Sequence, residues 1–132
     1  MPYDVVFITG DNAMRQSEKA TLPNLCGIPP ERMYFSKTLE EALQAVNAEA
    51  KTGGISVIVT DLSTGGVSIG NKVLEYVKEN KLGIPVIIKS VQPEEQYAPV
   101  LLRKGAFAYY EKTKPQKDLA GKVREALAQP RK

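Results

Sequence analysis

Five short apolar segments recur along the chain, and each is followed by a segment with helical periodicity. Three of them are nearly continuous runs of Val and Ile, which is typical of strands that are covered on both faces, as in a parallel sheet. Alternating strand and helix units with short connections fold as right-handed crossovers. The chain is therefore predicted to be an α/β protein, a (βα)5 doubly wound parallel five-stranded sheet with helices on both faces. The expected strands cover residues 4–9, 32–37, 55–60, 84–90 and 106–110.

The helical segments carry their own start and stop signals. Thr38 and Glu41 form a capping box ahead of an apolar stripe, so a helix is expected to begin there. Two more are expected over 68–80 and 115–128, where apolar residues recur at helical spacing. Pro99 falls inside the fourth helical pattern, where an interior proline costs about 3 kcal/mol. We therefore expect the fourth helix to be short or broken.

Length and composition favour one domain over residues 1–132. The chain has 132 residues, of which 42% are hydrophobic and 25% charged, and no linker or internal repeat interrupts it. No segment approaches the roughly 18 consecutive apolar residues of a membrane span, so we expect a soluble, cytoplasmic protein with no membrane contact. The basic excess in residues 112–132 has no aromatic residues interleaved to stack on bases, and we do not expect a nucleic-acid partner.

Histidine is absent and cysteine occurs once, as Cys26. A single cysteine cannot form an internal disulfide, and we expect it to be a core or loop residue. Without histidine there is no Ser-His or Cys-His catalytic pair, and we do not expect an enzyme. Any metal would be held by oxygen ligands, which favours Mg²⁺ or Ca²⁺.

Polar side chains follow the predicted strands at their carboxyl ends, where ligands bind in doubly wound folds. Asp11 and Asp61 could share a divalent cation with the main-chain carbonyl of Ser63. Lys112 could add a positive charge against the oxygens of a phosphoryl group on Asp61, and Ser90 a hydrogen-bond donor. These groups could place a phosphoryl group on an aspartate. The complete set is Gly10, Asp11, Asn12, Asp61, Ser63, Ser90 and Lys112.

Two stretches carry a family resemblance. "GAFAYYEK", residues 105–112, resembles the Gly-Ala-x-x-Tyr-x-x-Lys run of response-regulator receiver domains. "IPVIIKS", residues 84–90, is similar to the Pro-Val-Ile-x-x-Thr/Ser strand of the same family. The resemblance extends from Asp4 to about Leu127. It implies a CheY-like fold with the flavodoxin-like strand order 2-1-3-4-5.

The resemblance also implies a role for each candidate residue. It puts Asp61 at the phosphoacceptor position, Asp11 at the second acid of the metal-binding pair, and Lys112 at the lysine that binds the phosphoryl group. It makes Ser90 the switch hydroxyl and Tyr109 the switch aromatic. Mg²⁺ would be held by Asp11, Asp61 and the carbonyl of Ser63.

The implied function is a receiver domain in two-component, phosphorelay signal transduction. A histidine kinase or a phosphotransfer protein would donate the phosphoryl group to Asp61. A downstream protein partner would then recognise the face formed by the fourth helix, the fifth strand and the fifth helix.

The chain departs from the family pattern at four places near this site. Lys112 precedes Thr113, so the Lys-Pro pair that the resemblance implies is displaced to Lys114-Pro115. Gly10 stands where the family has an acid, so metal binding is expected to be weaker. Thr64-Gly65 replaces a Met-Pro pair, which gives a looser turn. Val91 follows Ser90 where a small residue is usual, and its branched side chain could crowd the approach to Asp61.

Other interpretations stay open from sequence alone. Asp61 could be a turn residue, Asp11 the N-cap of the first helix, and Tyr109 a permanently packed ring. The domain could then be a pseudo-receiver that binds a protein partner independently of phosphorylation. A third possibility is a flavodoxin-like nucleotide or flavin binder, because "TGDNA", residues 9–13, resembles a phosphate-binding loop at a helix N-terminus.

Overall fold

A five-stranded parallel sheet forms the centre of the computed structural model, which describes residues 3–50, 54–63 and 66–129. The strand order is β2-β1-β3-β4-β5, and every pair is parallel. The fold predicted from sequence, including the order 2-1-3-4-5, is confirmed. The strands are β1 (Val5–Ile8), β2 (Met33–Ser36), β3 (Val57–Asp61), β4 (Val86–Ser90) and β5 (Ala108–Glu111).

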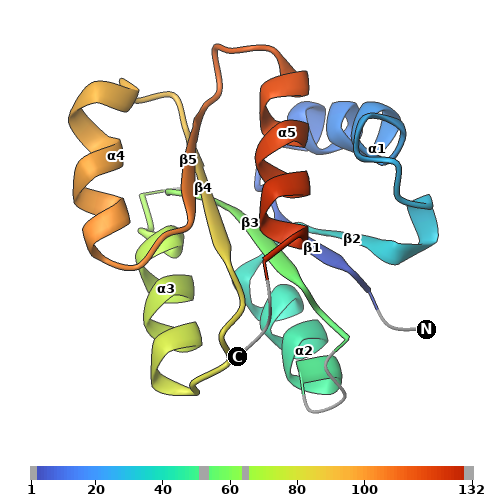
Figure 1. Cartoon of the computed structure of the whole chain (residues 1–132), viewed down its shortest axis with the longest axis horizontal. Helices are drawn as coiled ribbons and strands as arrows, with labels where there is room; N and C mark the ends of the chain where they lie inside the picture. Colours follow the sequence, from blue (N-terminus) through green and yellow to red (C-terminus); the bar gives the residue numbers. More distant parts are fainter. Residues whose placement is uncertain (1–2, 51–53, 64–65, 130–132) are drawn as a thin grey trace.

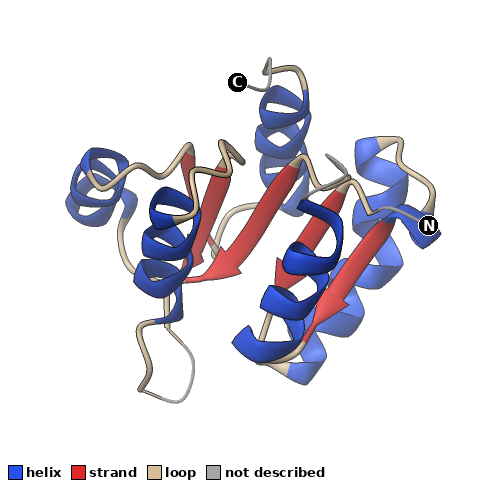
Figure 2. Ribbon diagram, turned by 90° about the horizontal axis from the view of Figure 1, so that it is seen from below, coloured by secondary structure: helices blue, strands red, loops and turns tan. Residues whose placement is uncertain are grey.

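Five α-helices connect and cover the strands. Helices α1 and α5 lie side by side on one face of the sheet, α2 and α3 cover the other, and α4 lies at the β5 edge (Figures 1 and 2). No helix of the described residues is both long and apolar enough to cross a bilayer. The helices are α1 (Asn12–Cys26), α2 (Leu39–Ala50), α3 (Ile69–Glu79), α4 (Glu94–Arg103) and α5 (Gln116–Leu127), with a 3₁₀ turn, η1, at Pro30–Arg32.

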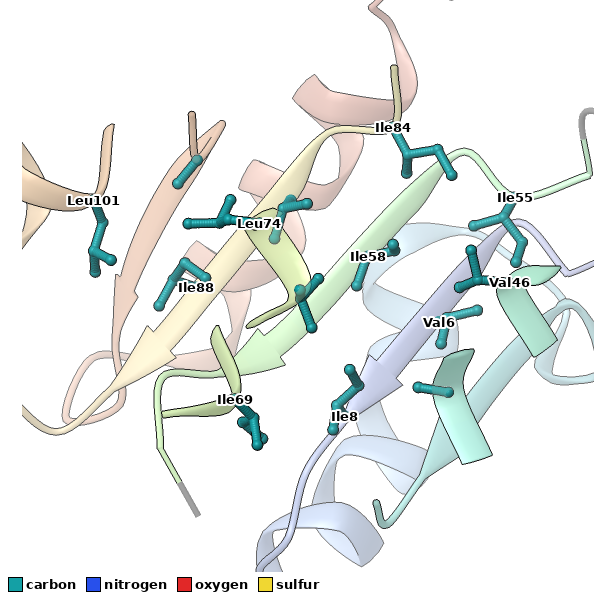
Figure 3. Packing of buried hydrophobic residues seen from close by; sticks show 14 of the residues in the cluster. Val6, Ile8, Val46, Ile55, Ile58, Ile69, Leu74, Ile84, Ile88 and Leu101 are labelled. Carbon is teal, nitrogen blue, oxygen red and sulfur yellow. The ribbon is translucent and has the colours of Figure 1, made fainter. Parts of the chain in front are cut away.

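The apolar side chains of each strand are shared between two cores. In β1, Val6 and Ile8 pack under α2 and α3, whereas Val5 and Phe7 pack under α1 and α5. Figure 3 shows the first of these cores, in which Val6, Ile8, Ile58 and Ile88 project from neighbouring strands. Because successive side chains point to opposite faces, a strand with two covered faces needs apolar residues at every position. This is why the inner strands read as continuous Val and Ile.

Local signals place the helix boundaries. The backbone N–H of Glu41 donates to Thr38 Oγ1 over 3.2 Å, and the Glu41 carboxylate accepts from the Lys37 N–H at 2.9 Å. The predicted capping box therefore forms, with its return bond one residue earlier than in the usual motif. Helix α4 is ten residues long and continues through Pro99. The expectation of a short fourth helix is confirmed, and the alternative of a broken one is wrong.

Cys26 lies at the end of α1 and packs in the core under α1 and α5, with 8% of its surface exposed. Burial raises the pKa of its thiol to about 11, an effect that nearby Arg124 partly opposes. Only the thiolate attacks a disulfide reagent. With its pKa raised to about 11, Cys26 has a thiolate fraction roughly a hundredfold smaller than that of an ordinary cysteine at the same pH.

We therefore expect the Cys26 thiol of the folded protein to react with an aromatic disulfide reagent at least about tenfold more slowly than in denaturant, at mildly alkaline pH. The measurement is the release of the coloured thiol over time. Equal rates in the two states would show that the thiol is accessible and ionised in the folded protein.

Candidate functional site

Asp61 and Lys112 meet at the carboxyl edge of the sheet. Asp61 is the last residue of β3 and is 2% exposed. Its Oδ1 lies 3.0 Å from Lys112 Nζ, and its Oδ2 accepts a hydrogen bond of 3.1 Å from the Gly10 backbone N–H. Strand β1 ends at Ile8 and β5 at Glu111, so one partner follows the strand next to β3 and the other follows β5, which lies on the far side of β4. The contact expected between Asp61 and Lys112 is present.

Ser90 ends β4 and lines a cavity of about 700 Å³, whose lining also includes Leu62, the residue after Asp61. Its Oγ accepts a hydrogen bond of 3.1 Å from the Gln92 N–H, and its carbonyl accepts one of 2.8 Å from the Lys112 N–H. Ser63 and Lys112 line the same cavity, together with residues of α3 and α4. Val91 also lines it but is 66% exposed, so most of its side chain faces solvent. Ser63, Ser90 and Lys112 thus surround one solvent-accessible space.

Tyr109 points inward from β5 and is 3% exposed. Its hydroxyl donates to the Gln92 carbonyl at 2.8 Å, which ties β5 to the loop after Ser90. Burial raises the pKa of Tyr109, and a hydrogen bond with Ser90 partly lowers it again. The ring is packed in this structure. Its role as a switch stays a prediction.

Asp11 is the N-cap of α1. Its carboxylate accepts a hydrogen bond of 2.7 Å from the Met14 N–H, and the residue is exposed. From sequence, Asp11 could be either a metal ligand or the N-cap of the first helix. In the structure its side chain caps α1. The backbone N–H of Gly10, rather than a side chain of this loop, contacts Asp61. Thr64-Gly65, the predicted loose turn, lies outside the described residues.

A buried ion pair next to Asp61 was not predicted. Lys89 in β4 is 1% exposed, and its Nζ lies 2.6 Å from Glu18 Oε2 and 2.5 Å from Thr9 Oγ1. The same Nζ lies 3.6 Å from Asp61 Oδ1. Glu18 comes from α1, is also 1% exposed, and accepts a hydrogen bond of 2.7 Å from the Thr9 hydroxyl.

The sequence carried a weak signal of this pair. Lys89 interrupts an apolar run that forms a central strand, and Glu18 falls on the buried face of α1. Buried charges are rare unless they are paired, so two such positions in one chain suggest a partner for each other. In the described residues Asp61, Glu18, Lys89 and Lys112 form one cluster with two negative and two positive charges.

The donor set does not fit a divalent cation. In the described part of the chain no group of three or more His, Cys, Asp or Glu residues could hold a metal. Gly10 offers no side chain, Asp11 caps α1, and the Lys89 ammonium occupies the space beside Asp61. A cation that approached Asp61 would meet that positive charge and that of Lys112. Mg²⁺ binding by Asp11, Asp61 and Ser63 stays a prediction of the resemblance, and this geometry argues against it.

Comparisons with known proteins agree with the fold. No family model matches the chain. The C4-dicarboxylate transport transcriptional regulatory protein DctD of Pseudomonas aeruginosa is 30% identical over 130 residues. That match covers 96% of this chain and 26% of DctD, so the chain spans about a quarter of the relative's length.

Solved structures of receiver domains superpose on nearly the whole chain. A response regulator receiver domain protein from Clostridium thermocellum has a TM-score of 0.77 and 22% identity, and the match covers 95% of this chain and 94% of that one. The receiver domain of the Francisella response regulator 1452 has a TM-score of 0.77 and 23% identity, with 96% and 97% covered. FixJ-N has a TM-score of 0.74 and 21% identity, with 98% and 97% covered. The resemblance stated from sequence is therefore confirmed, and the chain has the fold of response-regulator receiver domains.

Proposed function

We propose that this chain is a cytoplasmic receiver domain of a two-component system and that Asp61 accepts a phosphoryl group from a histidine kinase or a phosphotransfer protein. The observation that carries the proposal is the contact of 3.0 Å between Asp61 Oδ1 and Lys112 Nζ beside a cavity lined by Ser90. The cavity reaches Leu62, the residue after Asp61, and is large enough for a phosphoryl group. The fold supports the proposal, because ligands of doubly wound sheets bind at this edge.

The chemistry needs a nucleophile and positive charge. An Asp61 carboxylate oxygen attacks the phosphorus of a phosphohistidine, the O–P bond forms, and the P–N bond breaks with its electron pair left on the imidazole nitrogen. Lys112 stabilises the charge on the phosphoryl oxygens, and the Ser90 hydroxyl donates a hydrogen bond to one of them. The protein therefore contributes positioning and charge.

The structure offers a route from Asp61 to the surface. Tyr109 hydrogen-bonds to the loop after Ser90, and that loop leads into α4. The start of α4 is tied to the end of β5, because the Glu94 N–H donates to Glu111 Oε1 at 2.9 Å. A hydrogen bond from the Ser90 hydroxyl to a phosphoryl group would reorient this side chain, whose Oγ accepts from the Gln92 N–H, and so disturb this connection.

The α4-β5-α5 face is proposed as the surface that a downstream protein partner recognises. Of the large hydrophobic residues that are exposed in the described chain, three belong to α4, namely Tyr97, Val100 and Leu102. Exposed apolar side chains on one short helix favour protein contact, and Tyr97 and Val100 also line the cavity that Ser90 lines.

A second candidate function is a pseudo-receiver that binds its partner without phosphorylation. The Lys89–Glu18 pair favours it, because the carboxylate of Asp61 is already close to two ammonium groups in this structure. For a flavodoxin-like nucleotide or flavin binder the geometry is unfavourable. Asp11 occupies the N-terminus of α1 with its own carboxylate, where a phosphate would have to bind.

Intact-protein mass spectrometry after incubation with a phosphohistidine phosphotransfer protein, or with phosphoramidate as a small donor, tests the first function. We expect the mass to rise by one phosphoryl group in the natural protein and to stay unchanged in Asp61→Asn. Asp4→Asn is the matched control and should still be modified, because Asp4 pairs with Arg32 away from this site. Modification of Asp61→Asn, or none in the natural protein with either donor, would reject Asp61 as phosphoacceptor and leave the pseudo-receiver.

A further inference from the structure

We propose that the Lys89 ammonium, held by Glu18 and Thr9, takes the place of a divalent metal ion at Asp61, so that this site is built to work without metal. The inference concerns the resting site and holds whether or not Asp61 is phosphorylated, although it explains how the proposed function could proceed. Its basis is the geometry of Lys89 and the position of Gly10, which offers Asp61 a backbone N–H and no side chain.

Lys89 places a positive charge next to the Asp61 carboxylate. It lies in β4 directly beside Asp61 in β3, and the two residues are register partners in the parallel pair. Successive side chains alternate between faces, so neighbours in register point to the same face. The Lys89 Nζ therefore reaches the same space as the Asp61 carboxylate, 3.6 Å from its Oδ1.

The ammonium is fixed by oxygens on its other sides. Glu18 Oε2 at 2.6 Å and Thr9 Oγ1 at 2.5 Å accept its hydrogen bonds, and the Thr9 hydroxyl in turn donates to Glu18 Oε1 at 2.7 Å. These two hydrogen bonds hold the ammonium in place, and its contact with Asp61 Oδ1 at 3.6 Å is an ion pair rather than a hydrogen bond. Lys89 is 1% exposed, so water does not compete for its place.

The charge balance matches that of a metal site. In a metal site, the two positive charges of a divalent cation cancel the negative charges of the two carboxylates that hold it. Here the positive charge of Lys89 cancels the negative charge of Glu18. In both cases the group next to Asp61 and Lys112 has no net charge. One ammonium and one carboxylate thus replace one divalent cation and two carboxylates. A charged lysine retained in a core is costly unless it is paired, and Glu18 provides that pairing inside the same core.

The pair also leaves no room for the metal that it replaces. Two like charges within a few ångströms repel strongly in a poorly hydrated site. A divalent cation on Asp61 would have to displace Lys89 from both Glu18 and Thr9. We therefore expect the natural protein to bind no Mg²⁺ or Mn²⁺ at Asp61.

The test is an NMR titration with Mn²⁺, whose unpaired electrons broaden nearby amide signals. Three proteins are compared: the natural protein, Gly10→Asp, and Gly10→Asp combined with Glu18→Leu and Lys89→Met. Gly10 has a backbone conformation open to any residue, and its N–H already contacts Asp61, so an aspartate there adds the missing acid. Removing Glu18 and Lys89 together keeps the core free of an unpaired charge. The spectrum of each variant before Mn²⁺ is added reports whether it is folded.

At submillimolar Mn²⁺ we expect no selective broadening of Gly10, Asp61 or Leu62 in the natural protein. The triple variant should lose these signals and bind Mn²⁺ at least about tenfold more tightly than Gly10→Asp alone. Selective broadening around Asp61 in the natural protein would overturn the inference. Equal affinity of Gly10→Asp and the folded triple variant would also overturn it, because Lys89 would then not be what excludes the metal. Neither result depends on phosphorylation, which the mass measurement reports separately.

Discussion

Replacing Lys89 with methionine is expected to lower the free energy of unfolding by about 3–5 kcal/mol, the usual cost of breaking a buried pair by removing one partner. Lys89 and Glu18 are each 1% exposed and lie 2.6 Å apart. The substitution leaves the Glu18 carboxylate in the core, where the Thr9 hydroxyl still donates to it but no positive charge of the described residues pairs with it. Urea denaturation followed by circular dichroism measures the loss.

Two control variants separate the ion pair from the loss of a side chain. Glu18→Leu combined with Lys89→Met removes both charges and is expected to be near neutral or stabilising, because apolar residues of similar volume replace a desolvated pair. Lys72→Met removes an exposed lysine and should change the stability by less than about 0.5 kcal/mol. If Lys89→Met were as stable as the natural protein, the buried ion pair would not form in solution.

Replacing Lys112 with methionine is expected to slow phosphorylation of Asp61 by a factor of about 10²–10³, the typical effect of removing one preorganised donor from a developing oxyanion. Lys112 Nζ lies 3.0 Å from Asp61 Oδ1, and the side chain is 16% exposed, so its charge is only partly screened. The rate of mass increase with phosphoramidate measures the effect.

Lys114→Met is the matched control. Lys114 is two residues away, but its ammonium pairs with Glu94 at 3.2 Å and its side chain is 46% exposed. It should phosphorylate at nearly the natural rate. If Lys112→Met reacted as fast as Lys114→Met, Lys112 would be a structural partner of Asp61 with no part in the transfer.

Most of the fold was predictable from local patterns. Runs such as VVFI and VIVT read as strands because both faces of an inner strand are covered, and their register partners confirm it. The capping box at Thr38 placed the start of α2 correctly. Pro99 was harder, because tertiary packing of α4 against β5 can offset the local cost of an interior proline.

The site was predictable only in part. Asp61, Ser90 and Lys112 were identified because each lies at the end of a strand or directly after it, and strand ends of a parallel sheet converge at one edge. Asp11 also follows a strand, but its carboxylate caps α1 instead of pointing toward Asp61. The backbone geometry of the loop decides between these two orientations, and the sequence does not reveal that geometry. The Lys89–Glu18 contact joins residues 71 positions apart, and no local pattern links them.

The most direct test of the whole account is an NMR titration with beryllofluoride, a mimic of aspartyl phosphate, carried out once with a chelator and once with Mg²⁺. We expect the same large shifts of Asp61, Ser90, Tyr109 and α4 in both solutions, because Lys89 and Lys112 supply the positive charge. Shifts that need Mg²⁺ would keep Asp61 as the acceptor but contradict the role given to Lys89. No shifts in either solution would contradict the central claim that Asp61 is a site for a phosphoryl group.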